Sequence, residues 1–69
     1  MTQVIVNGER MDLADNASVQ AAVEAAGAPT EGRGVAVAVD GEVVPRGQWD
    51  STSLDEGQRV EVLRAVQGG

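Results

Sequence analysis

Two dipeptides in the sequence favour tight β-turns, Asn7-Gly8 and Asp40-Gly41. Each combines two residues that tolerate a positive φ angle, which a two-residue hairpin loop requires at both positions. Each dipeptide also stands between two short segments that are rich in β-branched residues or alternate polar with apolar ones. The sequence therefore predicts two antiparallel hairpins. The predicted strands are 3–7 and 9–13 in the first hairpin, and 35–39 and 42–44 in the second.

The segment between the two hairpins predicts one helix. Small apolar residues recur there at the spacing i, i+3, i+4 and i+7, which is one helical face: Val19, Ala22, Val23 and Ala26. Ser18 is the expected N-cap, with Asn16 as the alternative, and Gly27 is the expected residue after the helix end. A helix this short is not stable alone, so we expect it to pack against a sheet.

The segment 59–64 alternates again and predicts a fifth strand, with Val60 and Val62 on one face. A long connection through a helix allows the first and last strands to run parallel as central neighbours. The resulting order predicts an α+β fold: a mixed five-stranded sheet with one helix across one face, the β-grasp arrangement of ubiquitin-like proteins. Trp49 is the single aromatic residue, and we expect it to close one end of a small core.

Composition argues against several kinds of site. The chain of 69 residues has 11 acidic and five basic residues, and no cysteine or histidine. Its net charge of −6 argues against nucleic-acid binding. The usual nucleophiles and general bases are missing, so we expect neither an enzyme nor a resident cofactor, and no spaced carboxylates indicate a metal site. No apolar run reaches the roughly 20 residues of a membrane span, and no basic leader is visible, which predicts a cytoplasmic protein.

The sequence ends on Gly68-Gly69, directly after the last predicted strand. A frayed terminus is one interpretation. The other is an extended tail whose terminal carboxylate reacts, because glycine backbone passes where any side chain would clash. We expect a β-grasp domain over residues 1–65 and a flexible tail over residues 66–69.

Strict alternation predicts that Ile5 and Leu63 face away from the helix, together with Ala36 and Ala38. Apolar residues gathered on an open sheet face commonly mark a partner site. We therefore expect Ile5 and Leu63 to form a docking patch beside the tail. The alternative is that they are scattered surface residues of the ordinary kind.

The chain resembles the thiamine-biosynthesis sulfur carrier family, small ubiquitin-like proteins that end in Gly-Gly. The most specific combination is Val44-Pro45-Arg46 with Trp49, followed by the terminal pair of glycines. One departure is visible, because the family's helix usually carries a Leu-Leu pair where this chain has Ala22-Val23. The matching segments are 4–9, 18–19, 35–49 and 55–69.

The resemblance implies that the reactive group is the carboxylate of Gly69, and that Val66, Gln67 and Gly68 thread a partner's channel. The implied partners are an E1-like adenylating enzyme, a persulfide sulfur donor of the cysteine desulfurase type, and thiazole synthase, which takes up the sulfur from a thiocarboxylate on Gly69.

Three alternatives stay open. One is a carrier like the small subunit of molybdopterin synthase, against which Val44-Pro45-Arg46 with Trp49 argues. Another is a ubiquitin-like protein modifier. The lack of lysine prevents such a modifier from forming lysine-linked chains of itself, but it does not prevent single attachment to another protein. The third is an interaction module with an inert tail.

Overall fold

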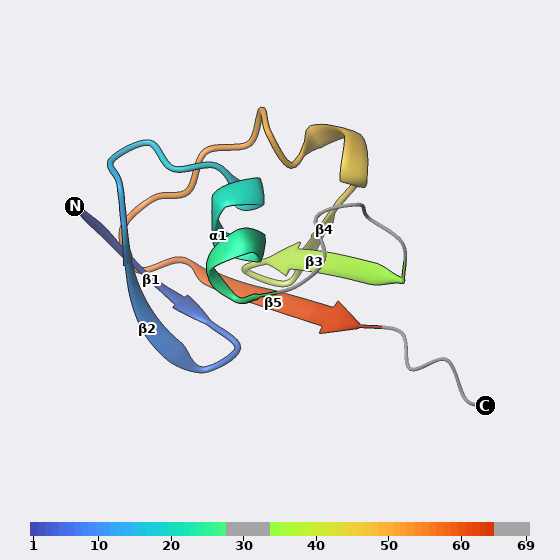
Figure 1. Ribbon diagram of the computed structural model, residues 1–69, viewed down its shortest axis with the longest axis horizontal. Coiled ribbons are helices and arrows are strands. Elements are labelled where there is room, and N and C mark those ends of the chain that lie inside the picture. Colours follow the sequence, from blue (N-terminus) through green and yellow to red (C-terminus); the bar gives the residue numbers. More distant parts are fainter. Residues whose placement is uncertain (28–33, 65–69) are drawn as a thin grey trace.

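The computed structural model describes residues 1–27 and 34–64. Its elements are β1 (Thr2–Val6), β2 (Glu9–Leu13), α1 (Val19–Ala25), β3 (Val35–Val39), β4 (Glu42–Val44), the short 3-10 helix η1 (Arg46–Gln48) and β5 (Arg59–Arg64). The strands form one sheet in the order β2-β1-β5-β3-β4, with α1 on one face (Figure 1). The pairing of β1 with β5 is parallel, so the predicted mixed sheet with one helix is confirmed. Within the described residues, no helix is long and apolar enough to cross a membrane.

Both predicted hairpin turns form. Asn7 and Gly8 have φ angles of 50° and 84°, and Asp40 and Gly41 have φ angles of 50° and 88°. Positive φ at both central positions matches the right-handed twist of the flanking strands. Since Asn7 belongs to the turn, β1 ends one residue earlier than the sequence predicts.

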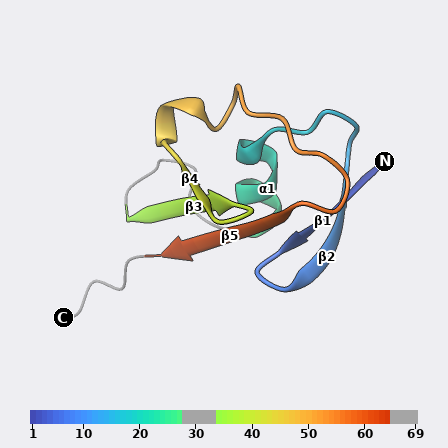
Figure 2. The same cartoon turned by 180° about the vertical axis from the view of Figure 1, so that it is seen from behind.

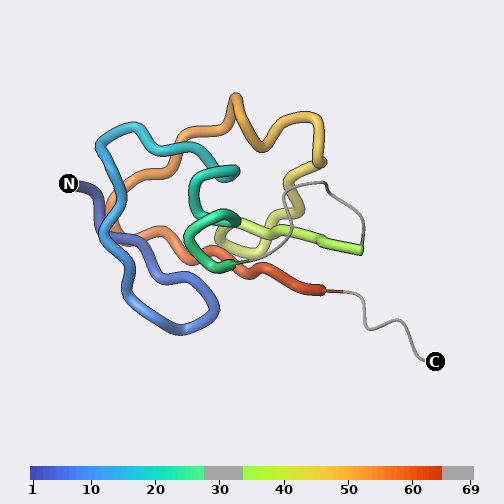
Figure 3. Tube along the Cα trace, in the orientation of Figure 1, coloured from blue at the N-terminus to red at the C-terminus, as the bar shows by residue number. Residues whose placement is uncertain are grey.

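The N-terminal end of α1 is held by side-chain and backbone contacts. Ser18 is the N-cap, as predicted, and its hydroxyl accepts a hydrogen bond of 3.3 Å from an amide of the first turn. The N–H groups of Val19 and Gln20 donate to the carbonyl oxygens of Thr52 and Trp49 at 2.9 and 3.0 Å. The segment 45–58 therefore passes close to the start of the helix (Figure 3).

The core lies between α1 and the sheet, and small side chains fill most of it. Trp49 is the exception and is only 1% exposed. Its indole Nε1 donates a 2.9 Å hydrogen bond to the carbonyl oxygen of Val44, and the guanidinium of Arg46 lies 4.9 Å from the ring centroid. The expectation that Trp49 closes the core is confirmed. The buried residues of this cluster are Val4, Val6, Val19, Ala22, Val23, Val37, Trp49, Leu54, Val60 and Val62.

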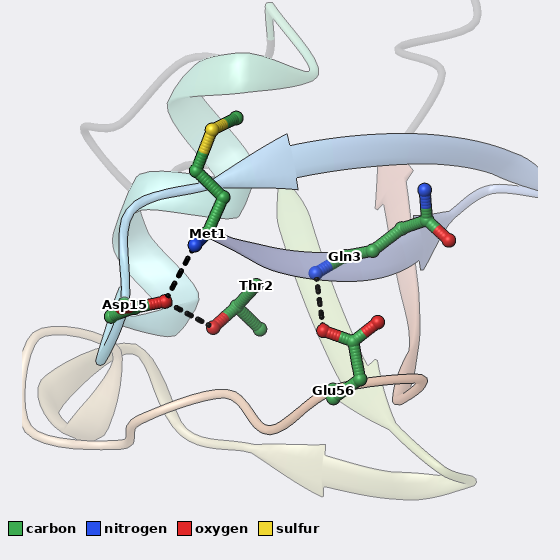
Figure 4. Close-up of polar contacts among 5 residues, drawn as sticks. All are labelled: Met1, Thr2, Gln3, Asp15 and Glu56. Atoms are coloured by element: carbon green, nitrogen blue, oxygen red, sulfur yellow. Dashed lines mark hydrogen bonds and ion pairs between the residues drawn. The ribbon is translucent and has the colours of Figure 1, made fainter.

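Acidic side chains secure the start of the first strand (Figure 4). The carboxylate of Asp15 lies 3.0 Å from the amino group of Met1 and accepts a hydrogen bond from the Thr2 hydroxyl at 3.3 Å. The carboxylate of Glu56 accepts a 2.9 Å hydrogen bond from the backbone N–H of Gln3. These carboxylates therefore satisfy backbone and terminal groups at one end of the sheet.

Candidate functional site

The central strand β5 leads the chain toward the two terminal glycines. It lies between β1 and β3, and in the view from behind it runs in front of α1 (Figure 2). Its last residue, Arg64, is also the last residue that the structure describes. The predicted reactive residue Gly69 and the predicted channel residues Val66, Gln67 and Gly68 lie outside the described residues. The structure therefore bears on the strand that precedes the tail.

One hairpin turn holds β5 near its tail end. The side-chain Oδ1 of Asn7 accepts a 2.8 Å hydrogen bond from the N–H of Val62, and its Nδ2 donates to the carbonyl oxygen of Val62 at 3.2 Å. The backbone N–H of Asn7 donates to the carbonyl oxygen of Val60 at 2.9 Å. Because β1 ends at Val6, the Asn7 side chain continues the ladder to β5 beyond the last residue of the strand.

The other hairpin turn holds the start of β5. The carboxylate of Asp40 accepts hydrogen bonds from the N–H of Arg59 at 3.0 Å and from the side-chain amide of Gln58 at 3.1 Å. The Arg59 N–H, followed by the Gln58 amide, holds the pKa of the Asp40 carboxyl below its ordinary value of 3.8. The two turns thus hold β5 from opposite sides, one at Arg59 and the other at Val60 and Val62. Sequence reasoning missed these contacts, because both depend on the register of the last strand against its two neighbouring strands.

The sheet face away from α1 is called the outer face below. Register and alternation place ten residues on it: Gln3, Ile5, Arg10, Asp12, Ala36, Ala38, Val43, Arg59, Glu61 and Leu63. Its most exposed apolar residues are Val43 and Leu63, which are 74% and 60% exposed, while Ile5 is half-buried. The predicted outward direction of Ile5 and Leu63 therefore agrees with the structure.

The structure places Ile5 and Leu63 in two separate hollows of the outer face. Ile5 borders a hollow with Arg59 and Glu61, whereas Leu63 borders another with Ala36. Along β5, Glu61 stands between the two positions. Both residues border the strand that leads to the tail, and the structure does not bring them together into one continuous cluster.

Val43 was not among the residues expected in the docking patch. It pairs with Ala38 in the ladder between β3 and β4, so it shares the outer face. The alternation of β4 contained this signal, because an inward Val44 requires an outward Val43. Val43 stands on the edge strand, two strands away from β5.

A mixed sheet that wraps one helix, with parallel first and last strands at its centre, defines a protein of the β-grasp class. The model of the ThiS family matches residues 4–69, and the chain therefore belongs to the ThiS family. The resemblance found in the sequence is thereby confirmed. A search of curated proteins by sequence found no significant match.

Two solved structures are similar over nearly the whole chain. The crystal structure of the thiamine biosynthesis protein (ThiS) from Geobacter metallireducens has a TM-score of 0.76 and 28% sequence identity, covering 99% of this chain and 100% of that chain. The solution structure of a thiamine biosynthesis protein from the same organism has a TM-score of 0.76 and 32% identity, covering 99% of this chain and 88% of that chain. Family and neighbours together support a small sulfur carrier of the ThiS type.

Proposed function

We propose that this chain carries the sulfur atom used to form the thiazole ring of thiamine. The observation that carries the proposal is the family match, which runs from residue 4 through the terminal Gly-Gly at residue 69. The neighbours named as thiamine biosynthesis proteins support the pathway. The chain acts as a protein co-substrate and not as a catalyst, and the proposal includes a cytoplasmic location and an E1-like adenylating enzyme as the first partner.

In the first step, a carboxylate oxygen of Gly69 attacks the α-phosphorus of ATP. A bond between that oxygen and phosphorus forms, and pyrophosphate leaves. The product is an acyl-adenylate, in which AMP is a good leaving group. The chemistry takes place in the adenylating enzyme, which agrees with a carrier that lacks cysteine, histidine and lysine of its own.

In the second step, the terminal sulfur of a persulfide attacks the acyl carbon of Gly69, and AMP leaves. A partner thiol then attacks the resulting sulfur–sulfur bond, which releases a thiocarboxylate on Gly69 and leaves a disulfide on the partners. We propose that a cysteine desulfurase supplies the persulfide and that thiazole synthase accepts the thiocarboxylate sulfur.

The tail suits this chemistry by its length and its small residues. When extended, the four residues Val66 to Gly69 span about 13 Å, which reaches well into a partner's site while the domain stays outside. A side chain at Gly68 would widen the chain where a narrow channel must close around it. The tail can therefore present its carboxylate only while Gly68 is small and Gly69 is terminal.

The test is ATP–pyrophosphate exchange with the cognate adenylating enzyme. Gly68→Val and a single alanine added after Gly69 should each abolish exchange and leave thermal stability unchanged. Gly47→Ala is the matched control, because a Cβ at Gly47 meets nothing within 4 Å, and it should exchange at the wild-type rate. Wild-type exchange by either tail variant refutes the proposal.

The mass of the intact chain separates the alternatives. After incubation with ATP, a sulfur source and the adenylating enzyme, replacement of one oxygen by sulfur supports the carrier. A covalent adduct with a second protein supports a protein modifier, and an unchanged mass supports an inert interaction module. Sulfur transfer to a molybdopterin precursor instead of the thiazole would assign the chain to molybdopterin synthesis.

A further inference from the structure

We propose that Asn7 is a positioning residue for the tail. Its side chain makes the last contact to β5 on the side of the first hairpin, and this contact helps to fix the direction in which the tail leaves the domain. The inference rests on the proposed function, because it concerns how the Gly69 carboxylate is presented to the adenylating enzyme. The relevant observation is the pair of hydrogen bonds from the Asn7 amide to the N–H and carbonyl of Val62. Val62 is two residues before the end of β5.

The Asn7 side chain takes the place of a missing strand residue. On the β1 side of β5, backbone ladder bonds run from the Ile5 N–H to the Gln58 carbonyl and from the Asn7 N–H to the Val60 carbonyl, at 3.0 and 2.9 Å. The backbone then turns away at Asn7 and Gly8. Val62 would be the next residue of β5 to need a partner on that side, and the amide of Asn7 supplies both the acceptor and the donor.

The identity of the residue at each turn fits the groups it binds. At Val62 one partner is a donor and the other an acceptor, so a side-chain amide satisfies both. At the other turn both partners of Asp40, the Arg59 N–H and the Gln58 amide, are donors, so a carboxylate satisfies both. Asparagine and aspartate tolerate a positive φ angle alike, so the turn geometry alone does not explain this difference.

Loss of the Val62 contact would let β5 separate from the first hairpin at its tail end. Because β3 still pairs with β5 as far as Arg64, the strand would then be held on one side only and would direct the tail less precisely. A tail that leaves the domain in a wider range of directions has a lower effective concentration of its end at a fixed site. The adenylating enzyme would therefore meet the Gly69 carboxylate less often in the productive position, although the domain stays folded.

Two matched variants test the proposal. Asn7→Gly and Asp40→Gly each keep a turn residue that accepts positive φ, and each removes the side-chain bonds to β5, one near the tail and one at the strand start. Asn7→Gly should lower kcat/KM of ATP–pyrophosphate exchange for the carrier by roughly tenfold to a hundredfold, the range that small misplacements of a reacting group produce. Asp40→Gly should stay close to wild type. Urea denaturation checks that both variants are folded in the assay.

Hydrogen exchange gives a second readout that needs no enzyme. The amide of Val62 should exchange faster in Asn7→Gly and keep its wild-type protection in Asp40→Gly. If Asn7→Gly fails to fold, Asn7→Asp becomes the test variant and Asp40→Asn becomes its control. Aspartate at this turn keeps the acceptor for the Val62 N–H and loses only the donor to the Val62 carbonyl.

Unchanged Val62 exchange in Asn7→Gly, or an equal effect of a variant and its control on kcat/KM, overturns the positioning role while the sulfur-carrier function stands. If the wild-type chain supports no pyrophosphate exchange, the proposed function fails and the positioning role fails with it.

Discussion

The guanidinium of Arg64 donates a 2.7 Å hydrogen bond to the carbonyl oxygen of Gly27. This contact joins the last residue of β5 to the residue that follows the C-cap of α1, where Gly27 has a φ angle of 75°. The C-terminal end of a helix carries partial negative charge, so a cation is favourable there. The helix end is thereby tied to the strand that leads to the tail.

Removing the Arg64 contact should lower stability modestly. We expect Arg64→Met to reduce the free energy of unfolding by about 1 kcal/mol, because it keeps much of the side chain's apolar length and loses a charged donor at the protein surface. Urea denaturation measures the change. Arg10→Met, at an exposed position of β2, is the control and should change stability by less than about 0.5 kcal/mol. Equal losses in both variants would contradict a specific role for the contact.

The indole of Trp49 should matter through its hydrogen bond as well as its bulk. Trp49→Phe leaves the carbonyl of Val44 without its 2.9 Å donor, and we expect a loss of about 1–3 kcal/mol from that group in addition to the smaller volume. Leu54→Met, also in the core, conserves volume and should cost less than about 1.5 kcal/mol. Thermal unfolding followed by circular dichroism compares the two. A smaller loss in Trp49→Phe than in Leu54→Met would show that the indole donor is dispensable.

Asp40 should make stability depend on pH in the acid range. Its pKa is lower in the folded state than in the unfolded state, because the folded state donates hydrogen bonds from Arg59 and Gln58 to the carboxylate. The stabilisation is therefore fully present above the unfolded value of 3.8 and is lost as pH falls through the depressed folded value. Urea denaturation between about pH 5 and about pH 2 should show a shallower loss for Asp40→Asn than for wild type. An identical dependence of stability on pH in the two proteins would show that Asp40 does not cause the loss at acid pH.

The outer face should bind a partner near the tail and not at its far edge. Leu63→Asp should weaken binding to the adenylating enzyme or to thiazole synthase, because an unpaired carboxylate is costly to bury in an apolar interface. Val43→Asp changes another exposed apolar residue, two strands away, and should bind as wild type does. Ile5→Asp tests in the same way whether the hollow beside Ile5 takes part in docking. If Leu63→Asp keeps its affinity in a titration and circular dichroism shows an intact fold, the predicted docking patch is wrong.

Local patterns were enough to predict the order of the elements. The two turn dipeptides placed the hairpins, and the apolar spacing from Val19 to Ala26 placed the helix, because both signals act over a few residues. The choice of Ser18 over Asn16 as N-cap was open in the sequence, since both side chains can cap; in the structure Asn16 takes a φ angle of 64° and Ser18 caps.

These local patterns could not predict contacts between segments that are distant in the sequence. The pairing of Asn7 with Val62 joins residues 55 positions apart, and its geometry depends on where β1 stops relative to β5. The separation of Ile5 from Leu63 likewise depends on the register of β1 against β5. The predicted flexible tail over 66–69, with its reactive Gly69, stays a prediction from the sequence.

The contacts of the Asn7-Gly8 turn also affect how fast the protein undergoes deamidation at Asn7. An asparagine before glycine is prone to deamidation, in which the Gly8 nitrogen attacks Cγ of Asn7, ammonia leaves, and water opens the cyclic imide to aspartate or isoaspartate. Here the amide is bonded at both of its polar atoms to Val62, so Cγ cannot turn to the Gly8 nitrogen without breaking both bonds. The folded chain should therefore accumulate isoaspartate at this position more slowly than the urea-unfolded chain. Where deamidation to aspartate does occur, the new carboxylate still accepts from the Val62 N–H, but the Val62 carbonyl loses its donor.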